Sequence, residues 1–140
     1  ANIVHATSTT AMYADLAERY ATDTPVETGE VVSLGGKEEI TKCMDDKSDT
    51  VFGVVSDHPA YLMNSEAGNN DTHPAIALKG RVPVKVTGKG SAGDRIVSGS
   101  YGTARVAQPG EATNFNTLGR LIKDKYNEET ALTECVIGVK

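Results

Sequence analysis

The chain has 140 residues, 39% of them hydrophobic, and carries 14 Lys and Arg against 19 Asp and Glu, for a net charge of −5. This length supports one domain with a thin core, because Trp is absent and only 5% of the residues are aromatic. The acidic balance and the lack of a basic stripe exclude the usual pattern of nucleic-acid binding. No apolar run reaches the roughly 18 residues of a membrane span, and residues 1–5 do not resemble a signal peptide.

The N-terminal residues are polar and lead into one predicted helix. Residues 1–10 include a Thr- and Ser-rich stretch with little to bury, which predicts an arm that lies on a neighbouring molecule. From residue 11 to residue 20, apolar side chains recur at the spacing of an amphipathic helix. A helix this short is not stable alone, so its apolar stripe is the candidate subunit interface. The stripe consists of Met12, Tyr13, Leu16 and Tyr20.

Beyond Pro25 the pattern changes to short strands separated by turns. Strands are predicted at residues 30–34, 38–43, 51–55, 61–63, 75–78, 80–86, 95–98, 103–107, 118–122 and 133–139. Gly35 and Gly36 predict a hairpin turn between the first two of them. The polar stretch from Ser65 to His73 predicts an exposed loop. The regular spacing predicts a mainly β domain over residues 11–140, an antiparallel sandwich or barrel-like domain with a short N-terminal helix.

Six segments of the chain carry a resemblance to a known family. They are Tyr13–Tyr20, Gly29–Gly36, Val51–Ser56, Ala60–Asn64, Ala77–Pro83 and Gly93–Ser98. In this order they resemble a module at the C-terminal ends of tailed-phage tail fibres, which also occurs in other virion structural proteins, notably of cyanophages. The resemblance extends over residues 12–139. It implies a non-enzymatic structural protein, located in the virion, that assembles as a homotrimer.

The resemblance also implies partners. Besides copies of itself, the chain is expected to contact major capsid or tail proteins, and a fibre tip would also meet a receptor on the host surface. Only about ten residues precede the matching region, too few for a fibre shaft, and Ala1 is the residue expected at the N-terminus if an initiator Met has been removed. These features favour a capsid decoration or head-fibre protein. A tail-fibre tip, as a fragment of a longer chain, is the other reading.

The same module is distantly similar to the intramolecular-chaperone, auto-processing domain of phage tailspikes and neck appendages. That similarity implies a domain that trimerises, helps its parent chain to fold and is then cut off before the Asp of a Ser-Asp-x-x-Glu motif. Asp15 and Glu18 match this spacing, and Ala14 stands in place of the Ser. On the predicted helix the two carboxylates would share one face, where one can raise the pKa of the other. Interaction with the helix dipole explains the same pair without catalysis, so self-cleavage by Asp15 and Glu18 is the alternative function.

Histidines and aspartates in loops are the only candidates for a metal site. His58 and His73 lie near acidic residues in the sequence, and Asp45, Asp46 and Asp49 lie together in one loop. A metal site needs three or four converging ligands at suitable spacing, which these residues do not provide. We therefore predict no metal and no cofactor. The sequence also contains no hydrolase motif that would indicate an ordinary enzyme.

The remaining motifs have simple structural explanations. The glycine-rich segment 88–93 lacks the Lys-Ser/Thr ending of a phosphate loop and predicts a tight turn. Cys43 and Cys135 are predicted to be free thiols, with a disulfide between them as the alternative. A carbohydrate-binding role at a fibre tip is a further hypothesis, and it depends on exposed aromatic side chains such as Tyr61 and Tyr101.

Overall fold

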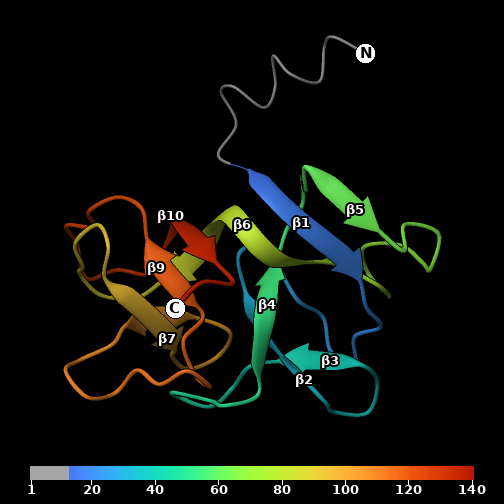
Figure 1. Ribbon diagram of the computed structural model, residues 1–140. Coiled ribbons are helices and arrows are strands. Elements are labelled where there is room, and N and C mark those ends of the chain that lie inside the picture. The colour runs from blue at the N-terminus through green and yellow to red at the C-terminus, as the bar shows by residue number, and fades with distance from the viewer. Residues whose placement is uncertain (1–12) are drawn as a thin grey trace, which may run out of the picture.

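The computed structural model describes residues 13–140, and within that range the protein consists of strands and loops, with no helix (Figure 1). The strands are β1 (Ala14–Arg19), β2 (Val31–Leu34), β3 (Ile40–Lys42), β4 (Val51–Val55), β5 (Tyr61–Met63), β6 (Ala75–Val86), β7 (Arg95–Ser98), β8 (Ala104–Val106), β9 (Gly119–Leu121) and β10 (Ala131–Ile137). The predicted mainly β class is confirmed. Buried and exposed side chains alternate in β1, whereas β2, β4 and β7 each carry three consecutive buried residues.

Five of these strands close into a barrel. β6 pairs with β10, β10 with β9, β9 with β7 and β7 with β8, all antiparallel, and β8 returns to β6 through one parallel pair, Val86 with Ala104. Closure gives these strands partners on both sides, which removes the exposed edges of an open sheet. The interior is filled by small and branched side chains, chiefly Val82, Val84, Val86, Ile96, Ala104, Leu121, Cys135 and Ile137.

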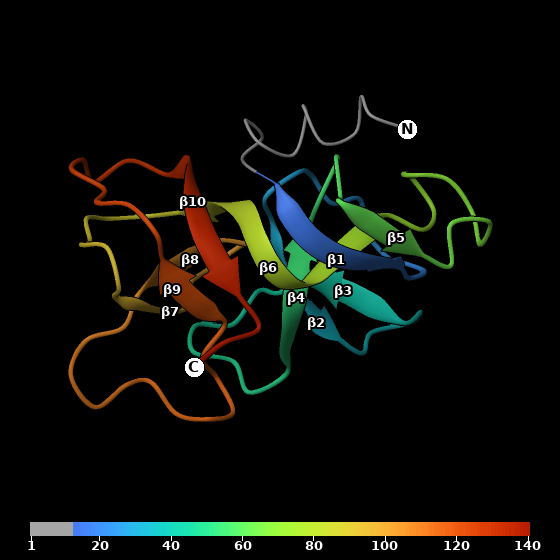
Figure 2. The same ribbon diagram turned by 45° about the horizontal axis from the view of Figure 1, so that its top comes forward.

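Strand β6 joins the barrel to the rest of the fold. The sequence predicted two strands here, residues 75–78 and 80–86, but the backbone continues through Gly80, whose φ is +115°. The first half of β6 pairs with β1 and β4, and the second half pairs with β10. Figure 2 shows β6 passing from beside β1 towards β10. One long strand therefore serves both halves of the molecule.

The remaining strands form a second layer beside the barrel. β2 and β3 make the predicted hairpin through Gly35 and Gly36, with Val32 opposite Lys42. β4 lies between β2 and β6, and β5 pairs with β1 alone among the described strands. A smaller apolar cluster fills this region, built from Val32, Ile40, Val55 and Ile76 with Tyr20 and Phe52 packed against them. The polar loop after β5 is exposed throughout Ser65–Thr72, as predicted.

The helix predicted over residues 11–20 is wrong where the structure describes the chain, because Ala14–Arg19 form β1. This strand is paired on both sides, parallel to β5 and antiparallel to β6, and these backbone hydrogen bonds replace those of a helix. Asp15 and Ala17 face inward, whereas Leu16 between them is 39% exposed. A charged residue at an inward position disguised the strand alternation. The predicted arm, residues 1–10, and Met12 lie outside the described residues.

Candidate functional site

The least expected buried group is the carboxyl of Asp15 on β1. The residue is 2% exposed, and neither of its carboxyl oxygens makes a hydrogen bond of normal geometry within residues 13–140. The same holds for the hydroxyl of Ser56, which lies beside it. Burial raises the pKa of Asp15, the Ser56 hydroxyl and a backbone amide partly offset this, and the charge of Asp57 raises it further. A buried carboxyl with a perturbed pKa is a candidate for chemistry.

The pKa of the neighbouring carboxyl, Asp57, is shifted in the opposite direction and favours the ionised form. Tyr13 donates a hydrogen bond from its hydroxyl to Asp57 Oδ1, and His58 Nδ1 lies 3.1 Å from the same oxygen. Burial opposes ionisation of Asp57, but the hydrogen bonds from Tyr13 and His58 outweigh it and lower its pKa. Two neighbouring carboxyl groups with pKa values pushed apart are the arrangement in which one acts as an acid and the other as a base.

The backbone around Asp15 is held tightly by its neighbours. Ala60 donates its backbone N–H to the carbonyl oxygen of Asp15 at 3.1 Å, just before β5 begins. On the other side, Gly80 of β6 lies against the carbonyl of Ala14 and the Cα of Asp15, so closely that a Cβ at position 80 would overlap them. The peptide bond between Ala14 and Asp15 is therefore fixed inside the sheet.

Glu18, the second residue of the predicted pair, lies apart from Asp15. Residues three apart on a strand face opposite sides of the sheet, and Glu18 accepts a hydrogen bond from the Tyr20 hydroxyl at 2.8 Å. The strand thus removes the shared face that a helix would have provided. Ser56 and Asp57 were not predicted as neighbours of Asp15, although their position directly after the apolar strand β4 marked the end of a buried segment.

The predicted interface residues divide into two groups. Tyr13 and Tyr20 are half-buried and pack against the two apolar clusters of their own chain. Leu16 is exposed and lies opposite Tyr61, which is 64% exposed, in the parallel pairing of β1 with β5. Leu16 and Tyr61 therefore form an apolar surface patch on adjacent strands.

The other candidate groups have structural surroundings. Cys43 and Cys135 are free and buried, and burial raises the pKa of Cys135 to about 12, which keeps it a thiol. Asp46 lies on the guanidinium of Arg105. In the part of the chain that the structure describes, no three His, Cys, Asp or Glu side chains converge as metal ligands. The same residues include no helix long and apolar enough to cross a membrane.

No protein-family model and no curated protein matches the chain, but solved structures do. The C-terminal fragment of bacteriophage phi29 gene product 12 superposes with a TM-score of 0.60 over 90% of this chain and 100% of the fragment, at 15% identity. The chain shares its fold with phage proteins. Pre-mature phi29 gene product 12 gives a TM-score of 0.62 over 91% of this chain at 15% identity, and the chain spans 22% of its length. The N base of the phi29 head fiber gp8.5 gives 0.51 over 85% of this chain and 90% of that one, at 12% identity.

Proposed function

We propose that this chain is a structural module of a phage virion, either a capsid decoration or head-fibre protein or the tip of a tail fibre. The observation that carries the proposal is the superposition of the complete C-terminal fragment of gene product 12 on 90% of this chain. The similarity to the N base of a head fiber points in the same direction. One of these neighbours is a fragment of gene product 12 and the other is the N base of a head fiber, and we assign a corresponding structural role to this chain.

In this role the module assembles as a homotrimer and contacts capsid or tail proteins. The patch of Leu16 and Tyr61 supports assembly as a homotrimer, because covering exposed apolar side chains on adjacent strands with a second copy is favourable in free energy. β5 is also a short edge strand within the described sheet, open to a further partner on one side. At a fibre tip, the exposed loop Ser65–Thr72 would face the host receptor.

Light scattering tests the trimer. The purified protein is expected to have a mass near three times 14.8 kDa, and Leu16→Glu is expected to shift it towards the monomer because the new charge would be buried in the contact. Leu34→Glu, at another exposed leucine at the end of β2, is the control and should leave the mass unchanged. A monodisperse wild-type monomer would contradict the proposal.

A second candidate function is self-processing between Ala14 and Asp15. It is favoured by one specific observation, the buried Asp15 carboxyl beside the ionised Asp57. In the reaction a water molecule adds to the Ala14 carbonyl carbon and the peptide bond breaks. One product then ends in the carboxylate of Ala14, and the other begins with the amine of Asp15. Asp15 would supply the proton that the leaving amine needs. Glu18 would take part only after leaving its hydrogen bond with Tyr20.

Intact mass spectrometry of protein stored at neutral pH tests self-processing. If it occurs, a species comprising residues 15–140 accumulates, and Asp15→Asn blocks it while preserving the size of the side chain. Glu18→Ala separates the two possible partners, since an unchanged rate in this variant and a loss in Asp57→Asn would assign the second role to Asp57. A persistent species of residues 1–140 would exclude efficient cleavage.

A further inference from the structure

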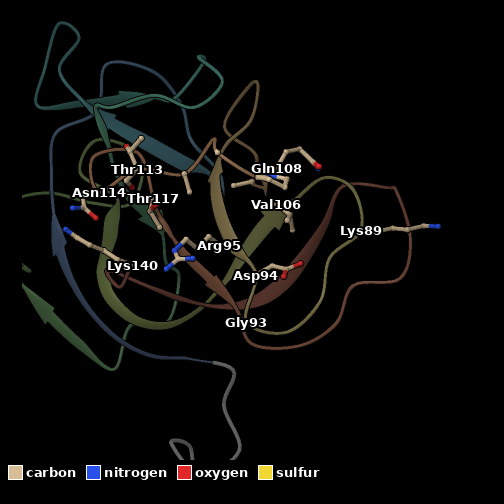
Figure 3. Close-up of a pocket in the computed structure, with 14 residues that line it drawn as sticks. Lys89, Gly93, Asp94, Arg95, Val106, Gln108, Thr113, Asn114, Thr117 and Lys140 are labelled. Atoms are coloured by element: carbon tan, nitrogen blue, oxygen red, sulfur yellow. Dashed lines mark hydrogen bonds between the residues drawn. The ribbon is translucent and has the colours of Figure 1, made fainter.

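A large cavity of the described chain lies at the barrel end of the molecule, away from Asp15. It measures about 730 Å³ and is bordered by the start of β7, the loop from residue 106 to residue 117, and Lys140. This volume is within the range of about 300 to 1,000 Å³ that is usual for small-molecule sites. In Figure 3, Lys140, Asn114 and Thr117 border one side of the cavity, Arg95 and Asp94 lie nearer its middle, and Lys89 lies on the far side.

Positive charge is concentrated at this cavity in a protein whose net charge is −5. Arg95 on β7 lies directly opposite Arg120 on β9 in the antiparallel ladder. Like charges in this position repel and destabilise a sheet. Arg120 donates to the main-chain oxygens of Gly93 and Lys140, so it holds together two residues that line the cavity.

The acidic side chains at and around the cavity already have hydrogen-bond or ion-pair partners, including Asp94, which itself lines the cavity. Asp94 accepts from the backbone N–H of Ser91, and Asp124 accepts from that of Ala92. Glu111 pairs with Arg105, and Glu128 lies 4.0 Å from Lys89. Within residues 13–140, no carboxylate pairs with the side chains of Arg95 or Lys140. Their charges therefore remain available to a ligand.

The rest of the lining is polar and suited to hydroxyl groups. Gln108 and Asn114 contribute side-chain amides, and Thr113 and Thr117 contribute hydroxyls. Phe115, which is 76% exposed, follows Asn114 in the same loop but does not itself line the cavity. Tyr61 and Tyr101, the aromatic residues that the sequence suggested for sugar binding, do not line this cavity.

We propose that this cavity binds an acidic saccharide. The guanidinium of Arg95 takes the anionic group in a forked pair of hydrogen bonds, and Lys140 contributes a second positive charge to the lining. The amides of Gln108 and Asn114 bind the hydroxyl groups. The anionic group is a carboxylate or a phosphate, since both fit the same two cations. The site does not depend on the virion role proposed above, so either can fail without the other.

Titration of the ¹⁵N-labelled full chain, followed by NMR, tests the proposal with four compounds. Trigalacturonate carries carboxylates, maltotriose is its neutral counterpart of equal length, glucose 6-phosphate carries a phosphate, and inorganic phosphate has no sugar. Trigalacturonate or glucose 6-phosphate is expected to cause saturable shifts at residues 93–95, 106–117 and 140. Maltotriose should bind at least about tenfold more weakly, the value of one lost charge-assisted contact.

Variants identify the groups responsible. Arg95→Gln is expected to weaken binding by about tenfold or more, and Arg95→Lys by less, because lysine keeps the charge but loses the fork. Lys37→Gln, at an exposed lysine on the β2–β3 turn, is the control and should bind as the wild type does. Absence of saturable shifts, equal binding of inorganic phosphate, or an unchanged affinity in Arg95→Gln would overturn the proposal. So would a change of oligomer mass in Arg95→Gln without any saccharide binding, since the cavity would then be a contact between copies.

Discussion

Replacing Asp15 by asparagine is expected to make the protein more stable at neutral pH. The wild-type carboxyl is 2% exposed and lacks hydrogen bonds of normal geometry within the described residues, so its ionisation inside the fold is costly. Asparagine has nearly the same shape and no charge, and its amide can donate to Ser56 or Asp57. We expect a gain of about 1 kcal/mol in the free energy of unfolding and a rise of roughly 3–5 °C in melting temperature.

The pH dependence of this gain follows from the direction of the pKa shift. The unfolded carboxyl titrates near its ordinary value of 3.8, and the native pKa of Asp15 is higher. The native state therefore binds the proton more tightly, and the stability of the wild type falls as the pH rises from 3.8 through the native pKa. The difference between wild type and Asp15→Asn should vanish below pH 3.8 and be complete at neutral pH.

Thermal melts across this pH range provide the measurement, with Asp49→Asn as the control. Asp49 is exposed in a loop, so its replacement should change the melting temperature by less than Asp15→Asn does. A loss of stability in Asp15→Asn at neutral pH would mean that the carboxylate is stabilised by its neighbours. A gain in stability, together with loss of processing, would identify Asp15 as a group kept for function at a cost in stability.

Replacing Gly80 by alanine is expected to be among the most damaging single changes in the barrel. Gly80 has φ +115°, a conformation unfavourable for other residues, and its Cα faces the carbonyl of Ala14 and the Cα of Asp15 in the neighbouring strand. The added methyl group must displace backbone in β1, which strand pairing holds on both sides. Conformational strain and overpacking together should cost about 3–5 kcal/mol.

Gly35→Ala is a matched control, because the two effects can be separated there. Gly35 has φ +119°, nearly the value at Gly80, but no atom lies within 4 Å of the position that a Cβ would take. Its replacement should therefore cost only the conformational part, about 1–2 kcal/mol. Urea unfolding of both variants measures the difference. Equal losses in the free energy of unfolding would show that crowding against β1 contributes nothing, because this strand would then move to accommodate the added methyl group.

Local patterns in the sequence were sufficient for most strands and turns. The apolar run of Val51–Val55 became β4, and Gly35 with Gly36 became a hairpin turn, because strand alternation and glycine conformation act within a few residues. The same kind of local pattern was misleading at Leu16 and Tyr20. Their spacing suited a helix, but pairing of Ala14–Arg19 with β5 and β6 on either side determined the strand.

The candidate sites depended on contacts between distant parts of the chain. Asp15 was recognisable from its spacing to Glu18, but its neighbours Ser56 and Asp57 are about 40 residues away and meet it only because β1 lies beside the end of β4. Likewise, Arg95 and Arg120 face one another through the register of β7 with β9. Sequence alone was enough for the β class and the turns, since these depend on neighbouring residues. Barrel closure, the burial of Asp15 and the cationic cavity were decided by the tertiary structure, because strand order and register bring together charges that no local pattern connects.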